Sequence, residues 1–134
     1  MADYYDTSAL AKLVLAEDET EALRGWLGDR HDITAVTSDL ARTELMRAAR
    51  RVDASLLGRV REVLDALTIV EIPSALFAAA GRLEPVTMRS LDAIHLAAAL
   101  DLGDDLDMLV AYDDRLLAAA RRHGIPISSP GSEA

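Results

Sequence analysis

The chain has 134 residues, of which 51% are hydrophobic, and a formal net charge of −9. This length suits one compact domain with its own core, and the acidic charge argues against non-specific nucleic-acid binding by the domain as a whole. The absence of cysteine excludes disulfides, zinc fingers and thiol catalysis. No apolar run reaches the roughly 20 residues of a membrane span, and no signal-peptide pattern opens the chain, so we expect a cytoplasmic protein without membrane contact.

The predicted elements alternate between short strands and helices. Strands are expected at residues 3–6, 32–38, 68–72, 108–112 and 125–127. Helices are expected at residues 7–15, 18–29, 39–51, 54–67, 74–83, 90–100 and 114–123. This order predicts one α/β domain over residues 1–127, with a short parallel sheet of four to five strands flanked by helices. The tail, residues 128–134, is expected to be disordered.

Four acidic residues lie where a parallel sheet would bind a ligand, which is beyond the carboxyl ends of its strands. Asp6 ends the first strand and Asp113 ends the fourth, in "LVAYDD". Glu44 in "LARTELMRA" and Asp92 in "SLDAIHLAAAL" lie inside otherwise apolar helices. Carboxylates facing a buried region are costly unless they are paired, hydrogen-bonded or bound to a cation. A shared Mg²⁺ or Mn²⁺ ion would satisfy them and could orient a water molecule.

Each of these acids also has a simpler structural explanation. Asp6 and Asp113 stand where a helix N-cap is expected, and Asp92 would favour the dipole at the start of its helix. Glu44 could pair with an arginine one or two turns further along its helix. The spacing alone therefore leaves both readings open and names no reaction.

Four segments of the chain resemble, in order and approximate spacing, the motifs of PIN-domain nucleases. They are "YYDTSALAKL" with Asp6, "ARTELMRA" with Glu44, "RSLDAIHLAAA" with Asp92, and "LVAYDDRLLAAARRHGI" with Asp113. The resemblance covers about residues 3–127 and is closest to the VapC toxins of bacterial type II toxin–antitoxin systems, which are single small PIN domains.

This resemblance implies a Mg²⁺- or Mn²⁺-dependent endoribonuclease, in which a metal-activated water attacks an RNA phosphodiester bond. Asp6 and Asp92 would be the most direct metal ligands, and Glu44 and Asp113 would act directly or through waters. The resemblance also implies a homodimer and a VapB-like antitoxin that occupies the active-site groove.

Further residues follow from the same motifs. Ser8 resembles the hydroxyl that supports the first acid in "DTS", and Asp114 is expected to support or cap beside the fourth acid. We expect the helix cap to pass to Thr7 or Ser8, which would free Asp6 for the metal. Six arginines flank the acids and could contact RNA or antitoxin, or could be solvated helix surface: Arg42, Arg47, Arg50, Arg51, Arg89 and Arg115.

Two residues depart from the family pattern. Ala111 stands before the fourth acid, where the family often has a threonine whose hydroxyl could position water or phosphate. Asp3 puts a charge in a strand that is usually apolar, and we expect it at the edge of the strand. His95, three residues after Asp92, is expected to be a hydrogen-bonded histidine in the packing surface of its helix. The alternatives are a hydrogen bond to the Asp92 carboxylate and a role as general base.

Two other functions remain open from the sequence. Ala111 is compatible with a PIN-like binding module whose catalysis is weakened. Another acid-cluster metal phosphohydrolase is the second alternative, although a haloacid-dehalogenase-type enzyme would need an aspartate where Ser8 stands.

Overall fold

The computed structural model describes residues 1–132, which fold into five strands and seven α-helices. The strands are β1 (Ala2–Tyr5), β2 (Thr34–Ser38), β3 (Thr68–Val70), β4 (Leu106–Val110) and β5 (Ile127–Ser128). The helices are α1 (Thr7–Val14), α2 (Thr20–Asp29), α3 (Leu40–Val52), α4 (Leu57–Asp65), α5 (Ser74–Gly81), α6 (Ser90–Asp101) and α7 (Asp114–Arg122). Two 3-10 turns lie at Ala54–Leu56 and Gly103–Asp105. Each predicted strand and helix has a counterpart, so the predicted α/β fold is confirmed.

All neighbouring strands of the sheet are parallel, in the order β3-β2-β1-β4-β5. The chain builds outward from β1 to β2 and β3, and then returns to place β4 on the other side of β1. The strand order therefore reverses between β1 and β4. Ligands of open α/β sheets bind in the crevice that such a reversal opens beyond the strand ends.

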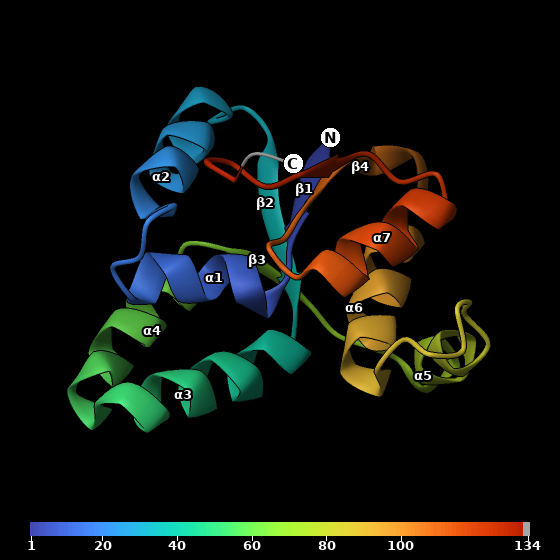
Figure 1. Ribbon diagram of the computed structural model, residues 1–134, viewed down its shortest axis with the longest axis horizontal. Helices are drawn as coiled ribbons and strands as arrows, with labels where there is room; N and C mark the ends of the chain where they lie inside the picture. Colours follow the sequence, from blue (N-terminus) through green and yellow to red (C-terminus); the bar gives the residue numbers. More distant parts are fainter. Residues whose placement is uncertain (133–134) are drawn as a thin grey trace.

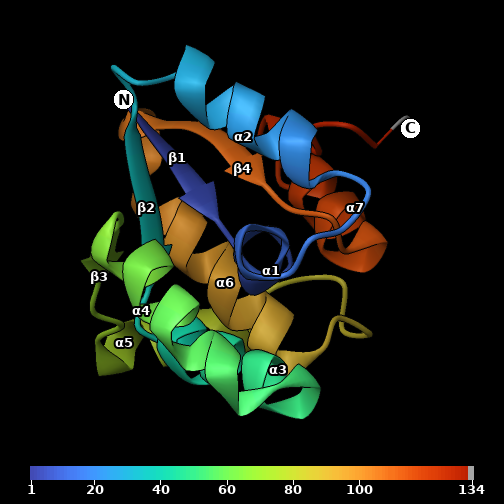
Figure 2. The same ribbon diagram turned by 90° about the vertical axis from the view of Figure 1, so that its left-hand side faces the viewer.

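Helices cover both faces of the sheet, with α1 to α4 on one side and α5 to α7 on the other (Figures 1 and 2). The alternation of side chains along β1 divides the core in the same way. Tyr4 packs with Leu96 and Leu116 beneath α6 and α7. Tyr5 packs with Leu10 and Leu45 beneath α1 and α3. These two apolar layers fix the central strand, and with it the position of the residue that follows it.

Asp3 lies inside the sheet rather than at its edge, so that expectation was wrong. Its side chain is 1% exposed, and Arg30 satisfies it through Nε–Oδ2 and Nη2–Oδ1 contacts of 2.6 and 2.9 Å. Arg30 also pairs with Asp107 of β4 and stacks over the Trp26 ring, 4.5 Å from its centre. A buried charge is tolerated here because a bidentate partner neutralises it.

The chain remains attached to the sheet after residue 127, contrary to the disordered tail expected from 128. Ser128 belongs to β5. Ser129 Oγ donates to the Ala111 carbonyl at 2.6 Å, and Tyr112 OH donates to the Pro130 carbonyl at 2.6 Å. Residues 133–134 of that predicted tail lie outside the described residues. Across residues 1–132, no helix combines the length and apolar character needed to cross a membrane.

Candidate active site

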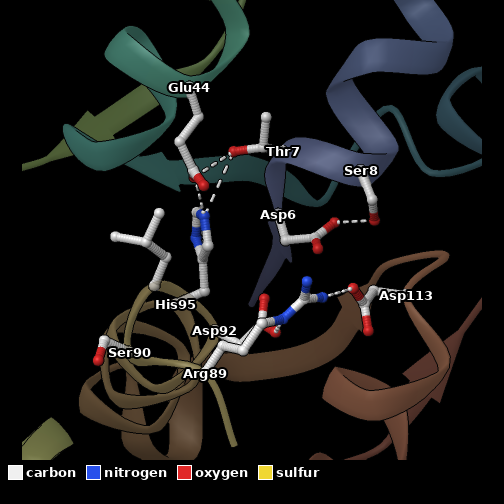
Figure 3. Close-up of a pocket in the computed structure, with 10 residues that line it drawn as sticks. Asp6, Thr7, Ser8, Glu44, Arg89, Ser90, Asp92, His95 and Asp113 are labelled. Carbon is white, nitrogen blue, oxygen red and sulfur yellow. Dashed lines mark hydrogen bonds and ion pairs between the residues drawn. The ribbon is translucent and has the colours of Figure 1, made fainter. Parts of the chain in front are cut away.

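A pocket of about 400 Å³ opens at the carboxyl ends of β1 and β4. Its lining includes all four acids selected from the sequence, Asp6, Glu44, Asp92 and Asp113. Figure 3 shows them converging from four separate elements of the fold. Asp6 and Asp113 cap α1 and α7, and Asp92 lies in the first turn of α6. Three helix N-termini therefore face the pocket, and their partial positive charge favours anionic groups there.

Asp6 both caps a helix and faces the pocket. It is 3% exposed, and its Oδ1 accepts hydrogen bonds from Ser8 Oγ at 2.7 Å and from Ala9 N at 3.0 Å. The cap therefore stays with Asp6, and the expectation that it would pass to Thr7 or Ser8 was wrong. Within residues 1–132 the other oxygen, Oδ2, accepts no hydrogen bond. One carboxylate can serve both purposes because the cap uses only one of its oxygens.

The Asp6 carboxylate lacks full charge compensation. Burial raises its pKa from 3.8 to about 6, and the nearby Asp113 acts in the same direction against the opposing effects of His95, Ser8 and the Ala9 amide. A pKa raised by desolvation means that the negative charge would gain from a cation placed in the pocket.

Ser8 connects the first acid to the strand that carries the fourth. Its hydroxyl donates to Asp6 and accepts from the backbone N–H of Tyr112 at 2.9 Å. This double contact fixes the Asp6 carboxylate relative to the end of β4, which is the geometry expected of a supporting hydroxyl.

Arg89 spans the two acids on the opposite side of the pocket. Its Nη2 lies 2.9 Å from Asp113 Oδ2, and its Nε lies 3.4 Å from Asp92 Oδ2. The Arg89 side chain is 62% exposed, whereas those of Asp92 and Asp113 are 15% and 25% exposed. Burial followed by the Asp113 charge raises the pKa of Asp92, although Arg89 opposes this. Asp113 also accepts the backbone N–H groups of Arg115 and Leu116, so it too is a cap.

Glu44 points into the pocket and pairs with neither Arg47 nor Arg51. Its Oε1 accepts from Thr7 Oγ1 at 2.6 Å and from His95 Nε2 at 2.6 Å. Burial acts to raise the pKa of Glu44, but these two hydrogen bonds together hold it below its usual value. The Glu44 carboxylate is thus already satisfied by the side chains of Thr7 and His95.

His95 is a buried link between α6, α3 and β1. It is 2% exposed, and its Nδ1 lies 2.8 Å from Tyr4 OH, which in turn lies 2.8 Å from Ser38 Oγ. A carboxylate can only accept, so the proton on Nε2 must point to Glu44. The prediction of a satisfied helix-packing histidine agrees with this burial. Its carboxylate partner is Glu44, however, and not the Asp92 of its own helix.

The remaining predicted site residues lie outside the pocket lining. Asp114 and Arg115 are exposed in the first turn of α7. Arg42 pairs with Asp39 at 3.2 Å, and Arg47 is exposed further along α3. Ala111 is fully buried in the apolar core beneath α6 and α7, so the missing threonine leaves this pocket's lining unchanged.

The family model of the PIN domain matches residues 4–124, which span nearly the whole chain and all four acids. The chain belongs to the PIN-domain family. Ribonuclease VapC47 of Mycobacterium tuberculosis (strain CDC 1551 / Oshkosh) is 45% identical, over 96% of this chain and 97% of the relative. Ribonuclease VapC46 of M. tuberculosis (strain ATCC 25618 / H37Rv) is 42% identical, over 96% and 98%. The resemblance to the VapC ribonucleases is therefore confirmed.

Solved structures agree with this PIN fold. A crystal structure of M. tuberculosis VapC20, described as a Sarcin-Ricin loop cleaving toxin, superposes with a TM-score of 0.72 at 17% identity and covers 88% of this chain and 95% of its own. PAE2754 from Pyrobaculum aerophilum gives a TM-score of 0.61 at 23% identity, covering 89% and 84%. At these identities the two structures support the fold alone.

The donor set of this PIN domain suits a hard divalent cation. Carboxylate oxygens are the ligands that Mg²⁺ and Mn²⁺ prefer, and the raised pKa of Asp6 marks a charge without a partner. As the side chains stand, no three acidic or histidine groups within residues 1–132 form a ready ligand set. Arg89 engages Asp92 and Asp113 instead. The carboxylates fit the ion by their chemistry, whereas in this arrangement Arg89 occupies Asp92 and Asp113.

Proposed function

We propose that this PIN domain is a Mg²⁺- or Mn²⁺-dependent endoribonuclease that acts as the toxin of a type II toxin–antitoxin system. The observation that carries the proposal is the convergence of Asp6, Glu44, Asp92 and Asp113 on one pocket at the strand-order reversal. The identity to ribonucleases of the VapC family over nearly the full chain supports RNA as the substrate.

The bound ion would supply an activated water and would neutralise charge on the phosphate during hydrolysis of the phosphodiester bond. Asp6 and Asp92 are the proposed direct ligands. Ser8 holds the Asp6 carboxylate through Oδ1, which leaves Oδ2 without a hydrogen bond from any of residues 1–132. Glu44 and Asp113 complete the acidic lining, directly or through waters. The N-termini of α1, α6 and α7 favour the anionic phosphate that must approach these acids.

The partners proposed for the domain follow from its family. We propose a VapB-like antitoxin that blocks the active-site groove, a homodimer as the assembly, and the cytoplasm as the place of action. A short antitoxin-like reading frame directly upstream of the coding sequence, and a complex of the two products that elutes together and does not cleave RNA, are the expected observations.

Sequencing of RNA 5′ ends after induction of the protein tests the proposed activity. We expect new, sequence-selective RNA ends and arrested growth in a host lacking the antitoxin. The Asp92→Asn variant should produce neither, and purified wild-type protein should stop cleaving in excess EDTA. Cleavage that persists in EDTA would contradict the metal mechanism, and unchanged growth on induction would contradict the toxin role.

A further inference from the structure

Three arginines near the end of α3 surround a hollow of their own. Arg47, Arg50 and Arg51 are exposed, and they alone line a depression of about 250 Å³. The hollow lies outside the acidic pocket. No apolar residue lines it, which distinguishes it from the apolar depressions elsewhere on the surface.

These arginines are not used within the fold. Across residues 1–132 none of the three forms an ion pair, a property shared with Arg61, Arg82, Arg115, Arg121 and Arg122, whereas Arg24, Arg30, Arg42, Arg59 and Arg89 all do. The acids nearest in sequence are already engaged. Glu44 accepts from Thr7 and His95, and Asp53 accepts from the Ser55 amide. In a chain of net charge −9, this cluster is a local inversion of sign.

The cluster lies on the helix that carries Glu44. Arg47 and Arg51 follow Glu44 by three and seven residues, so they lie on nearly the same side of α3. A rise of about 1.5 Å per residue puts Arg51 about 10 Å beyond Glu44 along the helix axis. Figure 1 shows α3 leading away from the carboxyl ends of the strands. A polyanion that reached the acidic pocket could therefore continue along this helix.

The chemistry of the hollow favours a phosphate backbone over a protein segment. Guanidinium groups bind phosphate oxygens in a bidentate manner, and binding of a nucleic-acid backbone depends on such cations. Protein partners gain most of their affinity from a few Trp, Tyr and Arg anchors in well-packed, desolvated pockets, whereas this hollow is lined by exposed arginines alone. The helix dipole gives a structural reason for Arg50 and Arg51 in the last turn, but Arg47 lies before that turn.

We propose that Arg47, Arg50 and Arg51 form a phosphate-binding subsite that holds the RNA backbone on one side of the bond to be cleaved. This inference rests on the proposed ribonuclease function. The subsite would resolve the conflict between an acidic protein and an anionic substrate, because it supplies attraction beside the acids rather than over the whole surface.

Binding of a fluorescein-labelled oligouridylate to the full chain in EDTA tests the subsite, because metal-dependent cleavage is then stopped. The test variant carries Arg47→Gln, Arg50→Gln and Arg51→Gln. The control variant carries Arg82→Gln, Arg121→Gln and Arg122→Gln, three exposed arginines near the ends of α5 and α7. Both variants lose three positive charges, so they differ only in where the charges are removed.

We expect the test variant to bind about tenfold or more weakly at low salt, with the slope of log affinity against log salt reduced by about 2 units, since each phosphate contact to a single strand contributes about 0.7. The control should change by less than half as much. Equal losses in both variants, no loss in the test variant, or no binding by the wild-type protein would overturn the subsite.

Wild-type cleavage in Mg²⁺ is measured in parallel. If the wild-type protein cleaves RNA and the test variant binds as tightly as wild type, the subsite alone is refuted. If the wild-type protein does not cleave RNA but the test variant binds more weakly than wild type, the nuclease function alone is refuted.

Discussion

Two carboxylates in the same pocket, Asp6 and Glu44, have pKa values shifted in opposite directions. Burial raises the pKa of Asp6 to about 6. The pKa of Glu44 is lowered, because hydrogen bonds from His95 and Thr7 outweigh its own burial. The difference arises from what surrounds each group. Asp6 accepts hydrogen bonds from a hydroxyl and an amide, lies near another acid and is affected by His95 only through its charge, whereas Glu44 accepts directly from the imidazole N–H of His95 at 2.6 Å.

The comparison divides the pocket into a satisfied half and an unsatisfied half. On the Glu44 side, a continuous chain of hydrogen bonds runs from Ser38 through Tyr4 and His95 to the carboxylate. On the Asp6 side, an exposed arginine is the cation that faces the two neighbouring acids. A metal ion would therefore gain most on the Asp6 side, which agrees with Asp6 and Asp92 as the proposed direct ligands.

The largest expected effect is the loss of RNA cleavage when Asp6, in the unsatisfied half of the pocket, loses its carboxylate charge. We expect Asp6→Asn to reduce the cleavage rate by more than about a hundredfold, since a lost ligand should cost more than the 10- to 100-fold typical of outer-shell changes. Glu44→Gln should reduce it by about tenfold. Rates on the same RNA at saturating Mg²⁺ compare the two. A larger loss from Glu44→Gln would reverse the assignment of the two halves.

The second effect is a change of opposite sign in the stability of the metal-free protein. The raised pKa of Asp6 means that its stability contribution is complete below about pH 4 and is lost as the pH rises through about 6. Asp6→Asn should therefore stabilise the protein above pH 7 by on the order of 3 kcal/mol, since one pKa unit corresponds to about 1.4 kcal/mol. Glu44→Gln should destabilise it there, because a lowered pKa gives stability that is present above the ordinary value and lost in acid.

Urea unfolding in EDTA at several pH values measures both variants against wild type. Addition of Mg²⁺ serves as the internal control, since a bound ion should stabilise wild type more at pH 7 than at pH 5 and should have little effect on Asp6→Asn. Shifts of the same sign in both variants would show that the two carboxylates share one environment.

A third, smaller effect tests whether His95 positions Glu44. A glutamine side chain can place an N–H near the position of Nε2, whereas leucine can donate nothing. We expect His95→Leu to weaken Mn²⁺ binding by about tenfold and His95→Gln to recover most of that loss. Isothermal titration calorimetry with Mn²⁺ gives the affinities of both variants. Urea unfolding measures their stability separately, and the free energy of unfolding should fall in His95→Leu because Tyr4 and Glu44 lose a hydrogen-bond partner. Equal affinities in the two variants would leave His95 with a purely structural role.

The sequence predicted the sheet and all four acids of the pocket, and for two of these acids a simple physical reason was enough. A residue that directly follows a strand must lie at the edge of the sheet, so Asp6 and Asp113 could be placed from strand periodicity alone. Helical positions are less determined, because periodicity tells which side of a helix is buried and not what it meets. The sequence therefore could not decide whether Glu44 pairs with a surface arginine or faces the pocket. The contact with His95, 51 residues away, decides it.

Features that depend on distant pairing could not be found in the sequence. Asp3 reads as an edge charge because its partner Arg30 is 27 residues away. The last residues read as a disordered tail because their anchors, the Ala111 carbonyl and the Tyr112 hydroxyl, lie on a different segment. In each case a polar group was judged by its local sequence, whereas its energy is set by a partner that only the fold brings near.

The smallest expected effect concerns the cation already present in the unsatisfied half. Arg89→Gln removes a positive charge beside Asp92 and Asp113, so these acids should bind Mn²⁺ more tightly, by about three- to fivefold. The gain is small because the Arg89 side chain is 62% exposed and such ion pairs contribute at most about 1 kcal/mol. Arg115→Gln is the matched control, since it removes the same charge from an exposed neighbour outside the pocket lining. Isothermal titration of both variants decides the point. Weaker Mn²⁺ binding by Arg89→Gln would mean that the arginine organises the acids for the ion, and equal gains in both variants would mean that only the overall charge matters.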